Sequence, residues 1–205
     1  MHPGAMKNRP FLRFGKYLNA GGISLPWYDL ETTASTMEVA HELVKAGCSA
    51  WTVITASHQS SGRGTHGRSW SSQMGKGLWL SVILPPPREA ADLSGLTLDT
   101  AHVLVQTFAT FADCPFLIKH PNDIVVNGRK IAGILVESAI EEGTVKSVIL
   151  GIGVNLLQTQ EDFSRDGLPD ATSLLIETGS APERQHFLTT FIEHLHSSYI
   201  LRYGQ

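Results

Sequence analysis

The residues best suited to chemistry lie in one short stretch, residues 59–70, which reads Gln-Ser-Ser-Gly-Arg-Gly-Thr-His-Gly-Arg-Ser-Trp. It holds three glycines, two arginines and one histidine, and no acidic residue. Glycine lets the backbone approach a ligand closely, and arginine donates paired hydrogen bonds to phosphate or carboxylate. The indole of Trp70 adds a flat apolar face. A surface turn is the simpler alternative, but a hairpin turn needs only one or two residues with special backbone angles. The stretch therefore predicts a loop that binds an anionic ligand carrying a ring, such as a nucleotide.

The same glycines, Gly62, Gly64 and Gly67, also match the G-x-G-x-x-G pattern of dinucleotide-binding loops. That pattern requires a strand before it, a helix opening from it and an acidic residue about twenty residues further on. A strand is predicted over 51–56, but residues 68–75 lack helical periodicity and the run 78–87 contains no acid. We therefore reject a Rossmann-type site.

Composition limits the function classes. With 205 residues, 42% hydrophobic and 17% charged, the chain is expected to form one globular domain with its own core. A net charge of −3 gives no general attraction to nucleic acid. Cys48 and Cys114 provide neither a disulfide framework nor a metal cluster. Neither a signal peptide nor a membrane-spanning run is recognisable. We expect a cytoplasmic protein that binds no nucleic acid and no membrane.

Three helices are predicted from apolar residues at helical spacing. The first follows Ser35, with Glu38 completing a capping box and Gly47 ending the helix. The second covers residues 93–111 and is expected to be broken or bent. The third covers residues 182–203 and is capped by Ser180; its apolar stripe is Phe187, Phe191, Leu195 and Tyr199.

Strands are predicted where short apolar or alternating runs end at turn residues. Asn127-Gly128 is the strongest hairpin signal in the chain. The predicted strands are 27–30, 51–56, 78–84, 116–119, 123–126, 129–139 and 144–152. Hairpins combined with three or four helices imply an α+β fold, with helices packed against a mostly antiparallel sheet.

Three further places could carry chemistry. The run 119–123, Lys-His-Pro-Asn-Asp, is a strand-end corner, although Asn and Asp also simply favour turns. Lys130 follows the hairpin turn, and strict alternation puts it on the face of Ala132, Ile134 and Val136. Gly133 predicts a close backbone approach or a bulge. The run 151–155, Gly-Ile-Gly-Val-Asn, is equally consistent with a bulged strand end or the wall of a ligand slot.

In order and spacing these motifs resemble the catalytic domain of the biotin–protein ligases, which have a class II aminoacyl-tRNA synthetase-like α+β fold. The resemblance covers most of residues 27–157. Its matching elements are Ser35-Thr36, 59–70, Pro121-Asn-Asp123, 128–137 and 151–155.

This resemblance implies a two-step reaction. Biotin and ATP form biotinyl-5′-adenylate and pyrophosphate, and a specific lysine of a biotin carboxyl carrier protein domain then accepts the biotin. Lys130 and Arg68 are implied as the catalytic residues, with Mg²⁺ carried on ATP rather than held by a protein cluster. The implied biotin-binding residues are Ser35, Thr36, Gln59, Gly62, Arg63, Lys130, Gly133 and Gly151. The implied ATP-binding residues are Arg68, Trp70, Asn122, Asp123, Lys130 and Asn155.

The chain departs from the family pattern at two positions. Thr65 replaces an arginine of the loop, which removes a charge from the expected phosphate contact. His120 replaces the tryptophan that usually precedes Pro121-Asn-Asp123. We further expect residues 1–205 to be a single catalytic domain, without an N-terminal helix-turn-helix and without the small C-terminal β-barrel. Homodimers formed by edge strands are common in the family, and the residues alone do not indicate one.

Two other functions stay open. The first is a lipoate or octanoate protein ligase or transferase of the same fold; an octanoyl transferase needs a nucleophilic cysteine, and neither Cys48 nor Cys114 lies in a pocket motif. The second is a biotin-binding sensor without turnover, to which Thr65 gives some weight.

Overall fold

The computed structural model describes residues 16–87 and 89–204. Its strands are β1 (Lys16–Ala20), β2 (Ile23–Thr33), β3 (Thr52–Gln59), β4 (Gly77–Leu84), β5 (Leu117–Lys119), β6 (Asp123–Val126), β7 (Arg129–Glu141) and β8 (Thr144–Asn155). Its α-helices are α1 (Thr36–Lys45), α2 (Leu93–Phe111), α3 (Gln160–Arg165), α4 (Leu174–Thr178) and α5 (Arg184–Tyr203).

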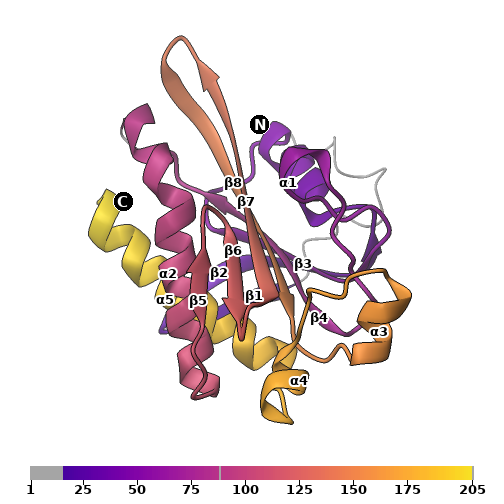
Figure 1. Ribbon diagram of the computed structural model, residues 1–205. Coiled ribbons are helices and arrows are strands. Elements are labelled where there is room, and N and C mark those ends of the chain that lie inside the picture. The colour runs from indigo at the N-terminus through magenta and orange to yellow at the C-terminus, as the bar shows by residue number, and fades with distance from the viewer. Residues whose placement is uncertain (1–15, 88, 205) are drawn as a thin grey trace.

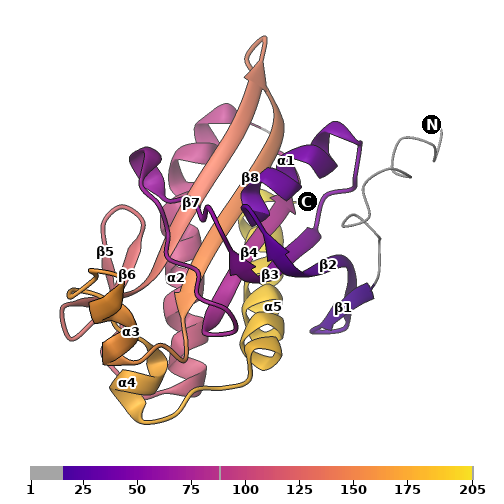
Figure 2. The same cartoon turned by 90° about the vertical axis from the view of Figure 1, so that its right-hand side faces the viewer.

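The strands form one sheet in the order β1-β2-β3-β4-β8-β7-β6-β5. Every neighbouring pair is antiparallel except β2 and β3, which are parallel. Helices α2 and α5 lie side by side on one face and α1 lies on the other (Figure 1). Figure 2 shows α3 and α4 together at the end of the sheet where β8 ends. The predicted α+β class, with helices packed on a mostly antiparallel sheet, is confirmed.

The core is divided by the sheet because a strand turns alternate side chains to opposite faces. In β4 every residue is buried. Leu78, Leu80 and Val82 belong to the large cluster under α2 and α5. Ile83 belongs to the smaller cluster under α1, which also contains Met37. The site described below occupies the α1 face, in the part that the smaller cluster leaves unfilled.

The helix predictions hold in part. Ser35 is the N-cap of α1, and Gly47 follows the helix with φ +76°. The capping box was wrong: Ser35 Oγ accepts from the Met37 N–H at 3.3 Å, and Glu38 supplies no reciprocal bond. The second helix was predicted to be broken or bent; α2 runs without a break from Leu93 to Phe111, with its buried residues on one face.

The third predicted helix, α5, starts later than expected. Glu183 is its N-cap, so the prediction for Ser180 was wrong. Ser180 instead follows Gly179, which ends α4 in a left-handed conformation. Neither α4 nor α3 was predicted, because such short helices carry too few turns to show a periodic pattern. The stripe of Phe187, Phe191, Leu195 and Tyr199 is buried as predicted.

A β-bulge in β7 changes the direction of Lys130. Val125 of β6 pairs with Lys130, but its neighbour Ile124 pairs with Ala132, so Ile131 is the extra residue. Ile131 and Ala132 are consecutive and both lie in the core. Lys130 therefore points to the face opposite Ala132, and the face predicted from strict alternation was wrong. A bulge re-aims side chains in this way.

None of the helices in the described part of the chain is long and apolar enough to cross a membrane.

Asp162 ties the short helix α3 to Lys76, in the turn before β4, and this contact predicts a pH dependence. The pKa of the buried Asp162 is lowered, first by the hydrogen bond from the Thr159 backbone N–H and then by Lys76, whose Nζ lies 3.1 Å from Oδ2. A lowered folded pKa contributes stability above the unfolded pKa, and this stability is lost as pH falls through the folded value.

We therefore expect Asp162→Asn to lower the free energy of unfolding at pH 7. The difference from the wild type should shrink as pH falls below about 4. Denaturant unfolding at a series of pH values measures this difference. The control is Glu161→Gln, an exposed carboxyl on the same helix. If the difference in free energy of unfolding between Asp162→Asn and the wild type does not depend on pH, the Asp162 carboxylate does not stabilise the fold through its lowered pKa.

Candidate active site

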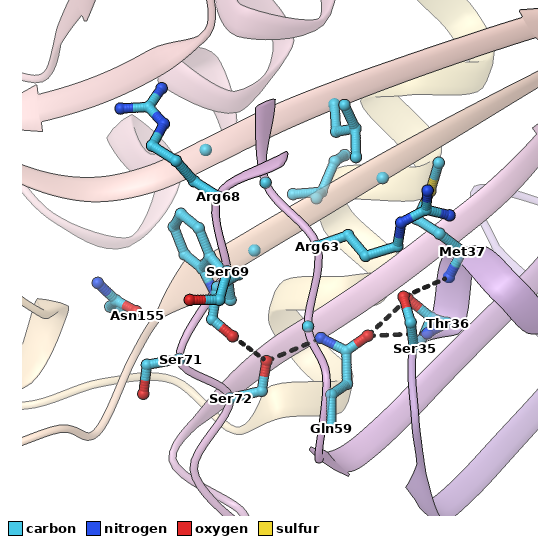
Figure 3. Close-up of a pocket in the computed structure, with 18 of the residues that line it drawn as sticks. Ser35, Thr36, Met37, Gln59, Arg63, Arg68, Ser69, Ser71, Ser72 and Asn155 are labelled. Atoms are coloured by element: carbon cyan, nitrogen blue, oxygen red, sulfur yellow. Dashed lines mark hydrogen bonds between the residues drawn. The ribbon is translucent and has the colours of Figure 1, made fainter. Parts of the chain in front are cut away.

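A cavity of about 760 Å³ opens on the α1 face of the sheet. It is enclosed by the start of α1, the loop after β3, strands β7 and β8, and the segment that follows α3. Figure 3 shows Thr36 at the start of α1 facing the loop that carries Arg63 and Arg68. Every residue named as a site candidate from the sequence lines it. These residues are Ser35, Thr36, Gln59, Gly62, Arg63, Arg68, Trp70, Asn122, Asp123, Lys130, Gly133, Gly151 and Asn155.

The arginine-containing loop folds as a miniature hairpin. Trp70 N–H donates to the Gly62 carbonyl and Gly64 N–H to the Arg68 carbonyl, each at 2.8 Å. His66, at φ 56°, and Gly67, at φ 72°, form its tip. A Cβ at Gly62 would lie 2.4 Å from the Trp70 carbonyl oxygen. Gly62 is thus required by the closure of the hairpin itself, whatever the cavity holds.

A buried polar network forms one end of the cavity. Gln59 Oε1 accepts from the Thr36 N–H at 2.8 Å and from the Thr36 hydroxyl at 3.1 Å. Gln59 Nε2 donates to Ser72 Oγ at 2.8 Å, and Ser81 Oγ donates to Thr36 Oγ1 at 2.8 Å. Figure 3 shows the Gln59 amide between Thr36 and Ser72. Because buried polar groups need partners, this network holds the start of α1 and the loop in a fixed relation.

Two glycines that face each other across β7 and β8 form the seat for Trp70. Gly133 pairs with Gly153. A Cβ at Gly153 would lie 2.3 Å from Trp70 Cε2, and one at Gly133 would lie 2.7 Å from Cζ3. The close approach predicted at Gly133 is therefore present, and the approaching group is the indole. Gly151 is covered in turn by Met37, whose Sδ would lie 2.7 Å from an added Cβ.

Lys130 is a cation that lines the cavity. Its Nζ lies 2.7 Å from Asp123 Oδ1 and 5.1 Å from the centre of the Trp70 ring. The ion pair is close, but its angle is not that of a hydrogen bond, and Asp123 Oδ1 is buried without a hydrogen-bond donor among the described residues. Opposite charges at this distance attract strongly when partly shielded from water. The pair holds Lys130 in the cavity beside the Trp70 indole.

Both arginines lie at the rim and are held by neighbouring groups. Arg68 donates to the Thr65 hydroxyl at 2.9 Å and to the Thr65 carbonyl at 3.3 Å. Arg63 lies 3.6 Å from Glu137, whose other oxygen is 2.6 Å from His41. The two guanidinium groups point in different directions (Figure 3). Thr65, which stands where the family's loop usually has an arginine, thus accepts hydrogen bonds from Arg68.

The two asparagines cross-link the walls. Asn122 Nδ2 donates to the Ile134 carbonyl at 3.2 Å. Asn155 Nδ2 donates to the Thr172 carbonyl at 3.0 Å, and its Oδ1 accepts from Gln158 at 3.0 Å. Both side chains line the cavity and also serve the fold. His120 is exposed and is not among the residues that line the cavity.

The sequence did not indicate the wall that follows α3. Phe163, Asp166, Leu168 and Ala171 line the cavity there. The Asp166 carboxylate accepts from Gln73 Nε2 at 2.8 Å and from the Ser71 hydroxyl, which ties this wall to the end of the loop. The segment has no periodicity and no motif, so only the pairing of distant elements could have revealed it.

The described residues contain no group of three or more His, Cys, Asp or Glu side chains that could hold a metal ion. No cysteine is among the described residues that line the cavity. Cys48 and Cys114 are both free thiols outside it. The described part of the cavity lining therefore offers a cation, amide and hydroxyl groups, and a flat indole, but no thiol nucleophile.

Comparisons with known proteins agree with this geometry. Residues 30–155 match the model of the Biotin/lipoate A/B protein ligase family. The chain is 39% identical over 184 residues to the bifunctional ligase/repressor BirA of Bacillus spizizenii, an alignment that covers 88% of this chain and 56% of that protein. It is 31% identical over 189 residues to the biotin–[acetyl-CoA-carboxylase] ligase of Mycobacterium tuberculosis, covering 87% and 67%.

The solved biotin protein ligase of Aquifex aeolicus in complex with biotin and ATP is similar with a TM-score of 0.72 and 28% identity, over 87% of this chain and 72% of that one. The present chain spans little more than half the length of the Bacillus relative. The family match covers most of the sheet and the greater part of the cavity lining. The protein belongs to the biotin/lipoate A/B protein ligase family.

Proposed function

We propose that this chain adenylates biotin with MgATP and transfers the biotin to a lysine of a biotin carboxyl carrier protein domain. One observation supports this most: a single cavity joins a buried amide and hydroxyl end, at Gln59 and Thr36, to a cationic end at Lys130. Biotin has a polar ureido ring at one end and a carboxylate at the other, so it matches both ends. The relatives named as biotin ligases and the Aquifex complex with biotin and ATP support the same proposal.

The chemistry explains why a fixed cation is needed. In the first step a biotin carboxylate oxygen forms a bond to the α-phosphorus of ATP, and the bond to the bridging oxygen breaks, so that pyrophosphate leaves with the electron pair. In the second step the neutral amine of the carrier lysine attacks the anhydride carbonyl, and AMP leaves. Two anions must meet in the first step, and a preorganised cation stabilises them. Lys130 is held in the cavity for this role, and Arg68 lies at the rim for the phosphates.

The remaining site assignments follow from position. We place biotin between the Gln59 network and Lys130, beside Arg63, and the nucleotide near Trp70, Asn122, Asp123 and Asn155. Mg²⁺ is proposed to arrive on the nucleotide, because the described residues offer no metal cluster. Residues 16–204 contain the whole cavity and are proposed to act as one catalytic domain. A reducing cytoplasm suits the two free cysteines. Pairing through an edge strand, β1 or β5, would give a homodimer.

Lipoate or octanoate activation is the alternative within the family. The ends of those acids that lie away from the carboxylate are apolar, so they would form no hydrogen bond with the amide and hydroxyl groups at Gln59 and Thr36, whereas a ureido ring could. A pyrophosphate-release assay with biotin, lipoate and octanoate decides between the substrates. Pyrophosphate release with biotin, and not with lipoate or octanoate, supports the proposal. Release with lipoate or octanoate instead refutes it, and biotin binding without release identifies a sensor.

Replacement of Lys130 should remove most of the adenylation activity. We expect Lys130→Ala to slow pyrophosphate release about 10²-fold or more, because the cation acts where charge develops in the transition state. Biotin affinity, measured by calorimetry, should change much less. The control is Lys119→Ala, an exposed lysine at the end of β5. Near-normal release by the Lys130 variant would reject the assignment and leave Arg68 and Mg²⁺ as the main stabilisers.

Thr65→Arg should slow the dissociation of biotinyl-5′-adenylate. An arginine–phosphate bond is roughly twice as strong as a neutral one and would lengthen retention about tenfold. Dissociation of preformed, labelled adenylate from the enzyme into an unlabelled chase gives the rate. Thr65→Gln controls for the longer side chain without the charge. If the arginine variant releases the adenylate as fast as the wild type, the cation at this position has no role in retention.

A further inference from the structure

The backbone of Lys130 is held by a segment far away in the sequence. Residues 170–177, here called the strap, include the first part of α4 and form one parallel bridge with β7, between Ala171 and Lys130. The Lys130 N–H donates to the Asp170 carbonyl at 2.8 Å, and the Thr172 N–H donates to the Lys130 carbonyl at 2.8 Å. Both backbone polar groups of Lys130 are thus bonded to the strap. The pairing of β6 with β7 is irregular at Lys130 because of the bulge. The two bonds to the strap therefore help to fix the Lys130 backbone.

The strap also reaches the nucleotide side of the cavity. The Thr172 carbonyl accepts from Asn155 Nδ2 at 3.0 Å. Thr172 and Ser173 are completely buried. Ser173 caps α4 by accepting from the Ile176 N–H at 3.2 Å. Through Thr172, one buried residue contacts two residues of the proposed site, Lys130 and Asn155.

Glu177 anchors the strap to the hairpin that carries Lys130. Its side chain is only 3% exposed. Oε1 lies 2.7 Å from Arg129 Nη2 and accepts from the Thr172 hydroxyl. Oε2 accepts from Asn127 Nδ2 at 2.7 Å. The carboxylate therefore joins the strap to the turn and first residue of β7, and each of its oxygens is bonded. Residue 177 lies outside the family-matched range 30–155.

We propose that Glu177 is a positioning residue for Lys130, acting through Thr172 and Arg129. The inference rests on the proposed function for its kinetic test. Without the carboxylate, the Thr172 hydroxyl and the Arg129 guanidinium lose their shared acceptor, and only the backbone bonds at Lys130 still join the strap to β7. The Lys130 backbone then shifts, and its ammonium leaves the point where two anions meet. A misplacement of about 1 Å can cost on the order of 10²-fold in rate.

The kinetic test is a double-mutant cycle on pyrophosphate release. We expect Glu177→Gln to slow release about tenfold while biotin affinity changes less than about twofold. In a Lys130→Ala background the same substitution should cause no further loss, since a residue that acts through Lys130 has nothing left to position. Thr172→Val should resemble Glu177→Gln, and Thr172→Ser, which keeps the hydroxyl, should restore the rate.

A matched carboxylate separates positioning from general stability. Asp99 of α2 also pairs with an arginine, Arg202 Nε at 2.8 Å, and accepts from a tyrosine hydroxyl, Tyr203 Oη at 2.6 Å. It lies on the far face of the sheet, among residues that do not line the cavity. Asp99→Asn should lower the melting temperature and leave pyrophosphate release unchanged.

Amide hydrogen exchange gives a readout that needs no activity. In the wild type the Lys130 and Thr172 amides are bonded to the strap and to β7. They should exchange faster in Glu177→Gln and Thr172→Val, and at the wild-type rate in Thr172→Ser and Asp99→Asn. Unchanged exchange at these two amides would overturn the inference, as would additive losses in the double-mutant cycle. Absence of release in the wild type would refute the proposed function alone, and the exchange rates would still decide the role of Glu177.

Discussion

The geometry of the cavity depends on one extra residue in β7. Ile131 is inserted opposite the β6 ladder, so that Lys130 faces the cavity while Ile131 and Ala132 both enter the core. In a regular strand Lys130 would share a face with Ala132, inside an apolar cluster where an unpaired cation is very unfavourable. The bulge removes that conflict. The bulge also disrupts the pairing of β6 with β7 locally. At that point the Lys130 backbone is bonded to Asp170 and Thr172 of the strap.

The two faces of the sheet follow different rules. The face under α2 and α5 is filled by large apolar side chains such as Phe108 and Phe187. On the other face, β7 and β8 carry Gly133 and Gly153 side by side, and their missing side chains make room for Trp70. The two glycines thus let the loop after β3 pack its indole flat against β7 and β8. The strands form the floor of the cavity, and the loop supplies further lining groups such as Arg63 and Arg68.

Local signals in the sequence were sufficient for much of the fold. Ser35 marked the start of α1, and Asn127-Gly128 marked the turn between β6 and β7, because both depend on contacts within a few residues. The site candidates implied by the order of the motifs all line the cavity, but the wall that follows α3 was not predicted. Their orientation was less accessible, since the bulge at Ile131 depends on pairing with β6, and alternation alone gave Lys130 the wrong face. The seat of Trp70 and the anchor at Glu177 join elements far apart in the chain, so no local pattern could reveal them.

The position of the strap along the chain also affects the order in which the protein can mature. The eight strands of the sheet end by Asn155, so all of them are synthesised before residues 170–177. Lys130 has its backbone partners, and Asn155 its carbonyl partner, only once Thr172 is in place. The floor of the cavity is therefore synthesised before the segment that fixes the Lys130 backbone, and a chain ending between Asn155 and Asp170 would hold every strand of the sheet but an unfinished cavity.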